Sequence, residues 1–202
     1  MTEMASKNYI INNLISSIQK LPGIGSKSAK RIVLNMLENK NKLIKPLIGA
    51  LEEAYNNINK CSICGNFTTN DVCEICDNPL RDKQTICIVE SIADLWAIEN
   101  TNVYNGIYHI LDGTLSAIEG RGIEVLLLDK LLDRIKENKI KEVIIATNPT
   151  IEGQTTANYL VNCLQDLNLK ITQLGYGVPM GSELNYLDDG TLNIAFKNKR
   201  EF

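Results

Sequence analysis

Residues 21–33 read LPGIGSKSAKRIV and separate two stretches in which apolar residues recur with helical spacing. The first stretch spans residues 7–20, and the second begins near Ser26, which we expect to be its N-cap. Pro22 and Gly23 form a strong interruption between them. With Gly25, Gly23 permits a tight turn with positive φ and leaves room for the backbone of a partner. The segment therefore predicts two helices joined by a glycine hairpin.

Three cations follow the hairpin, namely Lys27, Lys30 and Arg31. Residues 1–60 contain nine basic and four acidic residues, a net charge of +5, whereas the remainder contains twelve basic and twenty acidic residues, a net charge of −8. Free amides at a helix start and nearby cations suit a phosphodiester and read no base. The alternative is a plain helix-turn-helix with solvated lysines. We expect a helix-hairpin-helix element that binds the DNA backbone through Gly23, Gly25, Lys27, Lys30 and Arg31.

Four of the six cysteines form two Cys-x-x-Cys pairs separated by eight residues: Cys61, Cys64, Cys73 and Cys76. Two such pairs supply four thiolates to one tetrahedral zinc ion. The alternative is a pair of redox motifs, but these normally stand singly at the start of a helix in a thioredoxin-like unit. We expect one zinc ion per chain in a closed structural site, because no coordination position remains to activate water.

The spacing of apolar residues changes after the cysteines, from helical segments to alternating strands and helices. Strands are expected at 85–89, 107–111, 143–147 and 171–174, and helices at 92–98, 124–137 and 152–167. This alternation predicts βαβ units and a mostly parallel sheet, hence an α/β fold. We divide the chain into a helical DNA-binding module (1–58, with a third helix at 43–58), a four-cysteine zinc finger (59–80), an α/β domain (81–178) and a C-terminal segment (179–202). The tail at 191–202 is expected to be a short helix or loose.

Polar residues gather at the carboxyl ends of two predicted strands, where α/β proteins place their sites. Glu90 ends the first strand, and Asn148 and Thr150 follow a later one, just before Glu152. A strand-terminal Glu followed by a helix is the first signature of a Toprim domain. Catalytic Toprim enzymes have an Asp-x-Asp pair where this chain has Asn148 and Thr150. Since magnesium is bound by hard, usually anionic oxygens, we expect a Toprim scaffold without its metal chemistry.

Composition excludes several classes of function. With only one histidine, His109, a histidine-rich metal centre is impossible, and a Ser-His-Asp triad would have to use this residue, which lies among apolar neighbours. No apolar run approaches the length of a membrane helix, so no membrane association is expected. The first ten residues lack a basic stretch followed by an apolar one, so we expect no signal peptide and a cytoplasmic location.

The order of these parts resembles the RecR family of bacterial recombination proteins. The most specific motifs are LPGIGSKSA, the segment from Val89 to Asp94, ATNPTIEGQTTANYL and GVPMGSEL. The resemblance covers essentially the whole chain. It implies DNA contacts at Lys27 and Arg31, zinc ligands at the four clustered cysteines, and contacts to the partner protein RecO near Glu90 and Glu152.

The resemblance also implies a function that the residues alone do not reveal. Members of the family form ring-shaped homo-oligomers that can encircle DNA, and they act with RecO and RecF to load the RecA recombinase at single-stranded gaps. They have no established catalytic activity. We therefore expect a non-enzymatic recombination mediator in DNA repair, with a partner-binding face at Glu90, Asn148 and Glu152. The alternative is a magnesium-dependent Toprim nuclease or a primase-like enzyme.

Overall fold

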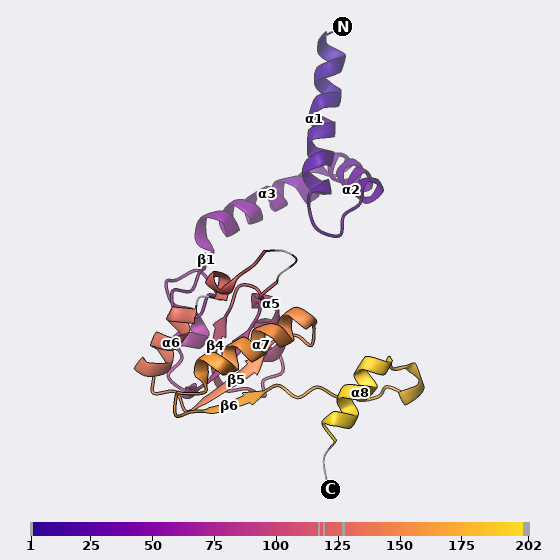
Figure 1. Cartoon of the computed structure of the whole chain (residues 1–202). Helices are drawn as coiled ribbons and strands as arrows, with labels where there is room; N and C mark the ends of the chain where they lie inside the picture. Colours follow the sequence, from indigo (N-terminus) through magenta and orange to yellow (C-terminus); the bar gives the residue numbers. More distant parts are fainter. Residues whose placement is uncertain (1, 117, 119, 127, 200–202) are drawn as a thin grey trace. The chain divides into compact units, whose positions relative to one another are not determined.

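The computed structural model describes residues 2–116, 118, 120–126 and 128–199 and forms two compact units, Met1–Ile58 and Asn59–Phe202 (Figure 1). The first unit contains three helices, α1 (Thr2–Gln19), α2 (Ser26–Glu38) and α3 (Lys40–Asn57). Between α1 and α2, the chain turns through Gly23, whose φ is +78°. The predicted N-cap was wrong by one residue, because Gly25 is the N-cap of α2 and Ser26 is already helical.

The helical unit buries only one face of one helix among its described residues. Ala29, Val33 and Met36, three or four residues apart, are buried on α2, whereas α3 has no buried residue. Large apolar side chains of α3 remain exposed: Leu43, Leu47, Leu51 and Tyr55. A single copy of this unit therefore leaves an apolar helix surface uncovered.

The second unit is built on a four-stranded parallel sheet, with strand order β4-β3-β5-β6. Its strands are β3 (Asp82–Val89), β4 (Gly106–Ile110), β5 (Glu142–Ala146) and β6 (Lys170–Gln173). All three pairings are parallel, so β3 and β5 end at the same edge of the sheet. The predicted α/β fold with a mostly parallel sheet is confirmed.

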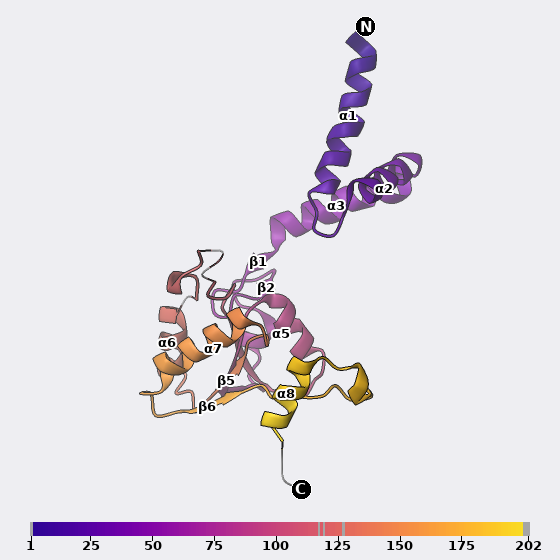
Figure 2. The ribbon, with the colours of Figure 1, turned by 45° about the vertical axis from the view of Figure 1, so that its right-hand side comes forward.

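Helices cover both faces of this sheet. On one face, α6 (Leu128–Glu137) and α7 (Ile151–Leu164) pack through Leu131, Leu160 and Leu164 against Ile86 and Ile88 of β3. On the other face, α5 (Ile92–Glu99) packs against the intervening β3 residues, which are buried as well. The two sides can be followed in Figure 2. Since side chains alternate along a strand, a strand buried on both faces has a continuous apolar sequence.

Several predicted helix boundaries differ from the structure, and the helix expected at 43–58 is α3, Lys40–Asn57. The helix expected at 124–137 is a short 3₁₀ helix, η1 (Ile123–Leu126), followed by α6. The helix expected to end at 167 ends at Leu164. In the tail, η2 (Leu184–Tyr186) precedes α8 (Asp189–Lys197), whose N-cap Asp188 accepts a hydrogen bond from the Thr191 amide. Periodicity alone does not distinguish a helix from a turn that precedes it.

The cysteine segment folds as a small hairpin and one helical turn within the second unit. Strands β1 (Asn59–Lys60) and β2 (Phe67–Thr68) pair antiparallel, and α4 (Glu74–Asp77) follows. Ile75 of α4 packs against the apolar cluster on the α5 side of the sheet. In the described part of the chain, no helix is long and apolar enough to cross a membrane.

Candidate functional site

The glycine hairpin presents the start of α2 to solvent. The first bond of the helix runs from the Ala29 amide to the Gly25 carbonyl, 2.9 Å away, so the amides of the three preceding residues have no intrahelical acceptor. A Cβ added at Gly23 or Gly25 would meet no atom within 4 Å. Only Gly23 needs to be glycine for its backbone conformation, because Gly25 is extended. Gly25 instead leaves the approach to the helix start open.

The three candidate DNA-binding cations are all exposed. Lys27 and Arg31 lie one turn apart on α2, and Lys30 precedes Arg31. None of the three side chains forms an ion pair or a hydrogen bond within the described part of the chain. The buried residues of α2 include Ala29 and Val33, so the cations lie off the packed face. Exposed cations beside free helix amides can hold phosphate oxygens without contacting a base.

The four clustered cysteines converge on one point. The Sγ atoms of Cys61, Cys64, Cys73 and Cys76 all lie within 4.8 Å of one another, and those of Cys64 and Cys73 are 3.5 Å apart. Four thiolates around a tetrahedral zinc ion, with Zn–S bonds of about 2.3 Å, lie about 3.8 Å apart. Three of the four cysteines are buried, and Cys76 is half-buried. The donor set and its spacing therefore fit zinc.

Backbone amides further prepare the sulfur atoms for a metal. The amide of Cys73 donates to Cys61 Sγ at 3.3 Å, and that of Asn66 donates to Cys64 Sγ at 3.4 Å. The first knuckle turn closes through Gly65, whose φ is +85° and whose amide donates to the Cys61 carbonyl. Amide donors stabilise thiolate sulfur, which is the form that binds a metal.

Without a cation, the packed thiols resist multiple ionisation. Contact with the Cys73 sulfur raises the pKa of Cys64 to about 12, and contacts with Cys64 and Cys73 also raise the pKa of Cys76. Thiol contacts from Cys64 and Cys76 lower the pKa of Cys73, so one thiolate is favoured in the cluster. A divalent cation at the centre would reverse this balance and favour four thiolates.

The knuckle is attached to the α/β domain by hydrogen bonds on two sides. The amide of Ile110, at the end of β4, donates to the Cys64 carbonyl at 3.1 Å. On the other side, Trp96 of α5 donates through Nε1 to Asn66 Oδ1, also at 3.1 Å. Sequence reasoning assigned no role to Asn66 or Trp96. An Asn shortly after the second cysteine of a knuckle gave no recognisable signal, because its partner is 30 residues away.

The strand-end residues Glu90 and Asn148 lie in direct contact. The backbone amide of Asn148 donates to Glu90 Oε1 at 2.7 Å, and its side-chain amide donates to Oε2 at 2.6 Å. Helix α7 starts beside them, with Thr150 as its N-cap accepting from the Gly153 amide. Glu152 lies in the first turn of α7, and its carboxylate has no hydrogen bond or ion pair among the described residues. The structure thus brings Glu90 and Asn148 together and leaves Glu152 on the adjoining helix turn without a bond to either.

Gly153 is a residue of this site that sequence reasoning did not single out. A Cβ there would lie 2.1 Å from the Asn148 carbonyl oxygen and 2.7 Å from Glu90 Oε1. The close approach of α7 to the two strand ends therefore requires glycine at this position. The signal in the sequence was a glycine within the first turn of a helix, where its low helix propensity needs a reason.

Comparison with known families accounts for nearly all of the chain. Residues 11–55 match the RecR helix-hairpin-helix, 58–78 the RecR four-cysteine zinc finger domain, 84–175 the Toprim domain and 177–200 the RecR C-terminal region. The chain is 48% identical over 198 residues to recombination protein RecR of Orientia tsutsugamushi (strain Ikeda), covering 98% of both chains. It is 44% identical over 199 residues to recombination protein RecR of Parvibaculum lavamentivorans, covering 98% of this chain and all of the relative.

The chain belongs to the RecR family. The resemblance read from the hairpin, the cysteines and the strand ends is thereby confirmed. The RecR zinc-finger match covers all four clustered cysteines, and the RecR helix-hairpin-helix match includes the glycine turn and its three cations. The Toprim match includes Glu90, Asn148 and Glu152. As a member of the RecR family, the chain combines a helix-hairpin-helix, a four-cysteine zinc finger domain and a Toprim domain.

Proposed function

We propose that this chain is a DNA-binding recombination mediator that acts without catalytic chemistry of its own. Its DNA contacts are Lys27, Lys30 and Arg31, with the backbone around Gly23 and Gly25. The observation that supports this most is the free start of α2 beside three exposed cations, in a unit that matches the RecR helix-hairpin-helix. Contacts of this kind hold phosphates and are independent of base sequence.

Zinc has a structural role in the proposal, with one ion per chain held by the four clustered cysteines. The supporting observation is the convergence of their sulfur atoms within 4.8 Å. The ion would supply folding free energy to a segment whose own strands are only two residues long. Because the protein fills all four positions, the site has no room for a reacting water.

The Toprim-like domain acts, in this proposal, as a docking surface for a basic protein. Both oxygens of Glu90 already accept hydrogen bonds from Asn148, which favours a structural role for that carboxylate over metal binding. The Glu152 carboxylate has no bonded partner in the described chain and is available to a cation of a binding protein. RecO is the partner that the family resemblance suggests, with RecF as a second, and loading of RecA at single-stranded gaps is the resulting activity.

Self-association into a ring completes the proposed function. The uncovered apolar residues of α3, among them Leu47, Leu51 and Tyr55, support it, because a stable monomer rarely leaves a whole helix face of this kind in water. Such a ring would act on chromosomal DNA in the cytoplasm.

A reconstituted loading assay tests the proposal directly. RecA filament formation is followed on gapped DNA coated with single-strand binding protein, with RecO present and with this chain added or omitted. We expect RecA to load faster when the chain is present. The Lys27→Glu/Arg31→Glu variant should not speed RecA loading. If the wild-type chain does not speed RecA loading at any ratio to RecO, the mediator function is contradicted.

A further inference from the structure

Arg134 of α6 is a buried cation that has no carboxylate partner in the described part of the chain. Only 7% of its surface is exposed, and its Nη1 atom donates to the Tyr108 carbonyl at 2.8 Å. Its Nε and Nη2 atoms are buried and have no hydrogen-bond partner among the described residues. Removing a guanidinium from water costs several kcal/mol unless an opposite charge compensates it. The position of Arg134 therefore calls for a negative group nearby.

The histidine that touches Arg134 does not provide that charge. His109 Nδ1 lies 3.2 Å from Arg134 Nη1. Burial, together with the positive charges of Arg134 and Lys130, lowers the pKa of His109 to about 3, so the ring is neutral at physiological pH. A neutral imidazole can accept a hydrogen bond from the guanidinium but cannot balance its charge. The countercharge must come from another group.

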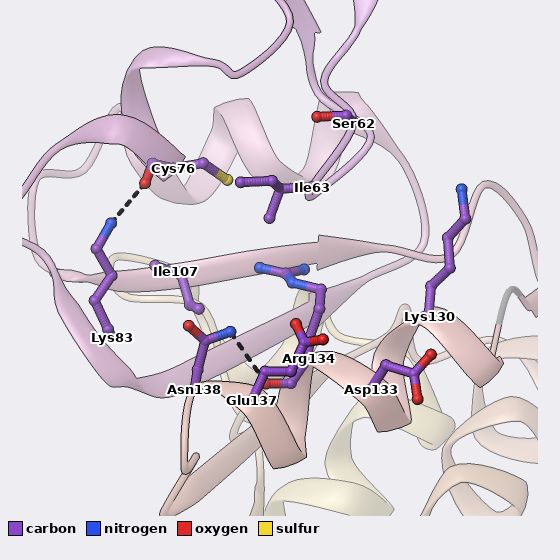
Figure 3. A pocket seen from close by; sticks show the side chains of 10 residues that line it. All are labelled: Ser62, Ile63, Cys76, Lys83, Ile107, Lys130, Asp133, Arg134, Glu137 and Asn138. Carbon is purple, nitrogen blue, oxygen red and sulfur yellow. Dashed lines mark hydrogen bonds between the residues drawn. The ribbon is translucent and has the colours of Figure 1, made fainter.

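The remaining neighbour is the four-cysteine cluster. Arg134 and Cys76 line one pocket, together with residues of the first knuckle, Ser62 and Ile63 (Figure 3). Asp133 and Glu137 line the same pocket but are exposed, and neither forms an ion pair with Arg134 in the described structure. Burial lowers the pKa of Arg134, and negative charge on the four cysteines acts in the opposite direction.

We propose that Arg134 is the charge-compensating partner of the zinc centre, positioned across β4 from the cysteines that bind the metal. This inference rests on the proposed zinc site. A zinc ion with four thiolates has a net charge of −2, and a buried guanidinium alongside offsets part of it. Zinc binding and burial of Arg134 therefore stabilise each other.

Strand β4 fixes the distance between the two groups. Arg134 donates to the Tyr108 carbonyl, and two residues later the Ile110 amide donates to the Cys64 carbonyl. The edge strand is thus bonded to α6 and to the first zinc knuckle within three residues. Arg134 is a positioning residue in this arrangement, since no hydrogen bond in the described structure joins it to a cysteine. It couples the zinc finger to the α6 side of the domain.

The test measures zinc affinity by chelator competition in the full-length chain, comparing wild type with Arg134→Met, Arg134→Lys and Lys136→Met. Lys136 is the matched control, because it is an exposed cation on the same helix. We expect Arg134→Met to weaken zinc binding about 10- to 100-fold, the usual effect of losing an outer partner of a metal site. Arg134→Lys should recover part of the affinity, and Lys136→Met should leave it unchanged.

A second measurement separates charge compensation from simple packing. The melting temperature of wild type and of each variant is measured with zinc and after chelation. The rise in melting temperature caused by zinc is then compared between the proteins. Charge compensation predicts that Arg134→Met shrinks the zinc-dependent rise in melting temperature, whereas a packing role lowers both temperatures equally. If Arg134→Met does not fold, Arg134→Gln provides the same comparison. If wild type and the folded Arg134 variants have equal zinc affinities and equal zinc-dependent rises in melting temperature, the inference is overturned. If the wild type binds no zinc, the metal site itself is refuted.

Discussion

Asn148 holds both carboxylate oxygens of Glu90, one through its backbone amide at 2.7 Å and the other through its side-chain amide at 2.6 Å. This double contact ties the end of β3 to the loop after β5. In a magnesium-dependent Toprim enzyme, an acidic residue at the second position would repel Glu90 unless a metal lay between them. An amide at this position makes the pair stable without a metal, which supports a scaffolding role for this edge of the sheet.

Replacing Gly153 should test how closely α7 must approach that pair. In Gly153→Ala, the new Cβ would lie 2.1 Å from the Asn148 carbonyl oxygen, so backbone must shift. We expect a loss of about 1 to 3 kcal/mol in the free energy of unfolding, measured by urea denaturation. Gly175→Ala is the control, because an added Cβ there meets no atom within 4 Å. Equal stability of Gly153→Ala and Gly175→Ala would show that α7 moves away from the strand ends freely.

Charge reversal at Glu152 should weaken binding of a basic partner. The Glu152 carboxylate has no bonded partner of its own within the described residues, so Glu152→Lys removes no internal contact and places a cation on the proposed docking face. We expect the affinity for RecO, measured by titration calorimetry, to fall at least several-fold at low salt and less at high salt. Direct DNA binding should stay nearly unchanged.

Asp166→Lys makes the same charge change at an exposed residue beyond the end of α7 and serves as the control for Glu152→Lys. Unchanged RecO affinity in Glu152→Lys would remove the docking proposal. Incubation of the wild type with DNA and magnesium or manganese should give no cleavage. Metal-dependent nicking that Glu90→Ala abolishes would favour the enzyme alternative.

Zinc removal should be visible through the single tryptophan. Trp96 is half exposed, and its Nε1 donates to Asn66 Oδ1 inside the cysteine segment, so loss of the knuckle fold breaks this bond and exposes the rest of the indole to water. We expect a red shift of Trp96 emission on chelation, reversal on adding zinc, and the chelated spectrum in Cys73→Ser. Metal analysis of freshly purified, reduced protein should give one zinc per chain. A spectrum that is unchanged after complete zinc loss would show that the knuckle folds without metal.

The buried, neutral His109 should make the free energy of unfolding decrease as pH falls. The pKa of His109 is about 3 in the folded chain and about 6.5 when unfolded, so the unfolded state binds the extra proton between these values. The stability that the folded chain gains from a neutral His109 is complete above pH 6.5 and is lost as pH falls toward 3. We expect the unfolding free energy of wild type to fall by about 2 kcal/mol more than that of His109→Gln between pH 7 and pH 5. Identical pH profiles of the two proteins would refute the buried neutral ring.

The sequence allowed the α/β fold to be predicted because its strongest signals are local. The buried strand around Ile86–Val89 is continuously apolar, and the interruption at Pro22 and Gly23 ends the first helix. The cysteine pairs likewise combine four ligands within 16 residues, so their convergence follows from spacing alone. Local patterns of this kind need no knowledge of the tertiary fold.

Residues whose role depends on distant partners were not predictable. Arg134 resembles any basic residue in the last turn of an amphipathic helix, and only its burial beside β4 distinguishes it. The contact between Asn66 and Trp96 spans 30 residues and has no periodic signature. The helix boundary at Leu128 was wrong because the 3₁₀ turn before it has the same apolar spacing as the helix.

DNA affinity as a function of salt tests the central claim most directly. Fluorescence anisotropy with unrelated DNA sequences should give equal affinities that fall steeply with salt, since the proposed contacts are to phosphates. Lys27→Glu/Arg31→Glu should lower the affinity at least tenfold and the slope of log K against log salt by about 2, with an unchanged circular dichroism spectrum. Lys136→Glu/Lys141→Glu, the same charge change at exposed residues of the second unit, should have little effect. A folded Lys27→Glu/Arg31→Glu protein with wild-type affinity and slope would contradict the hairpin as the DNA-binding element.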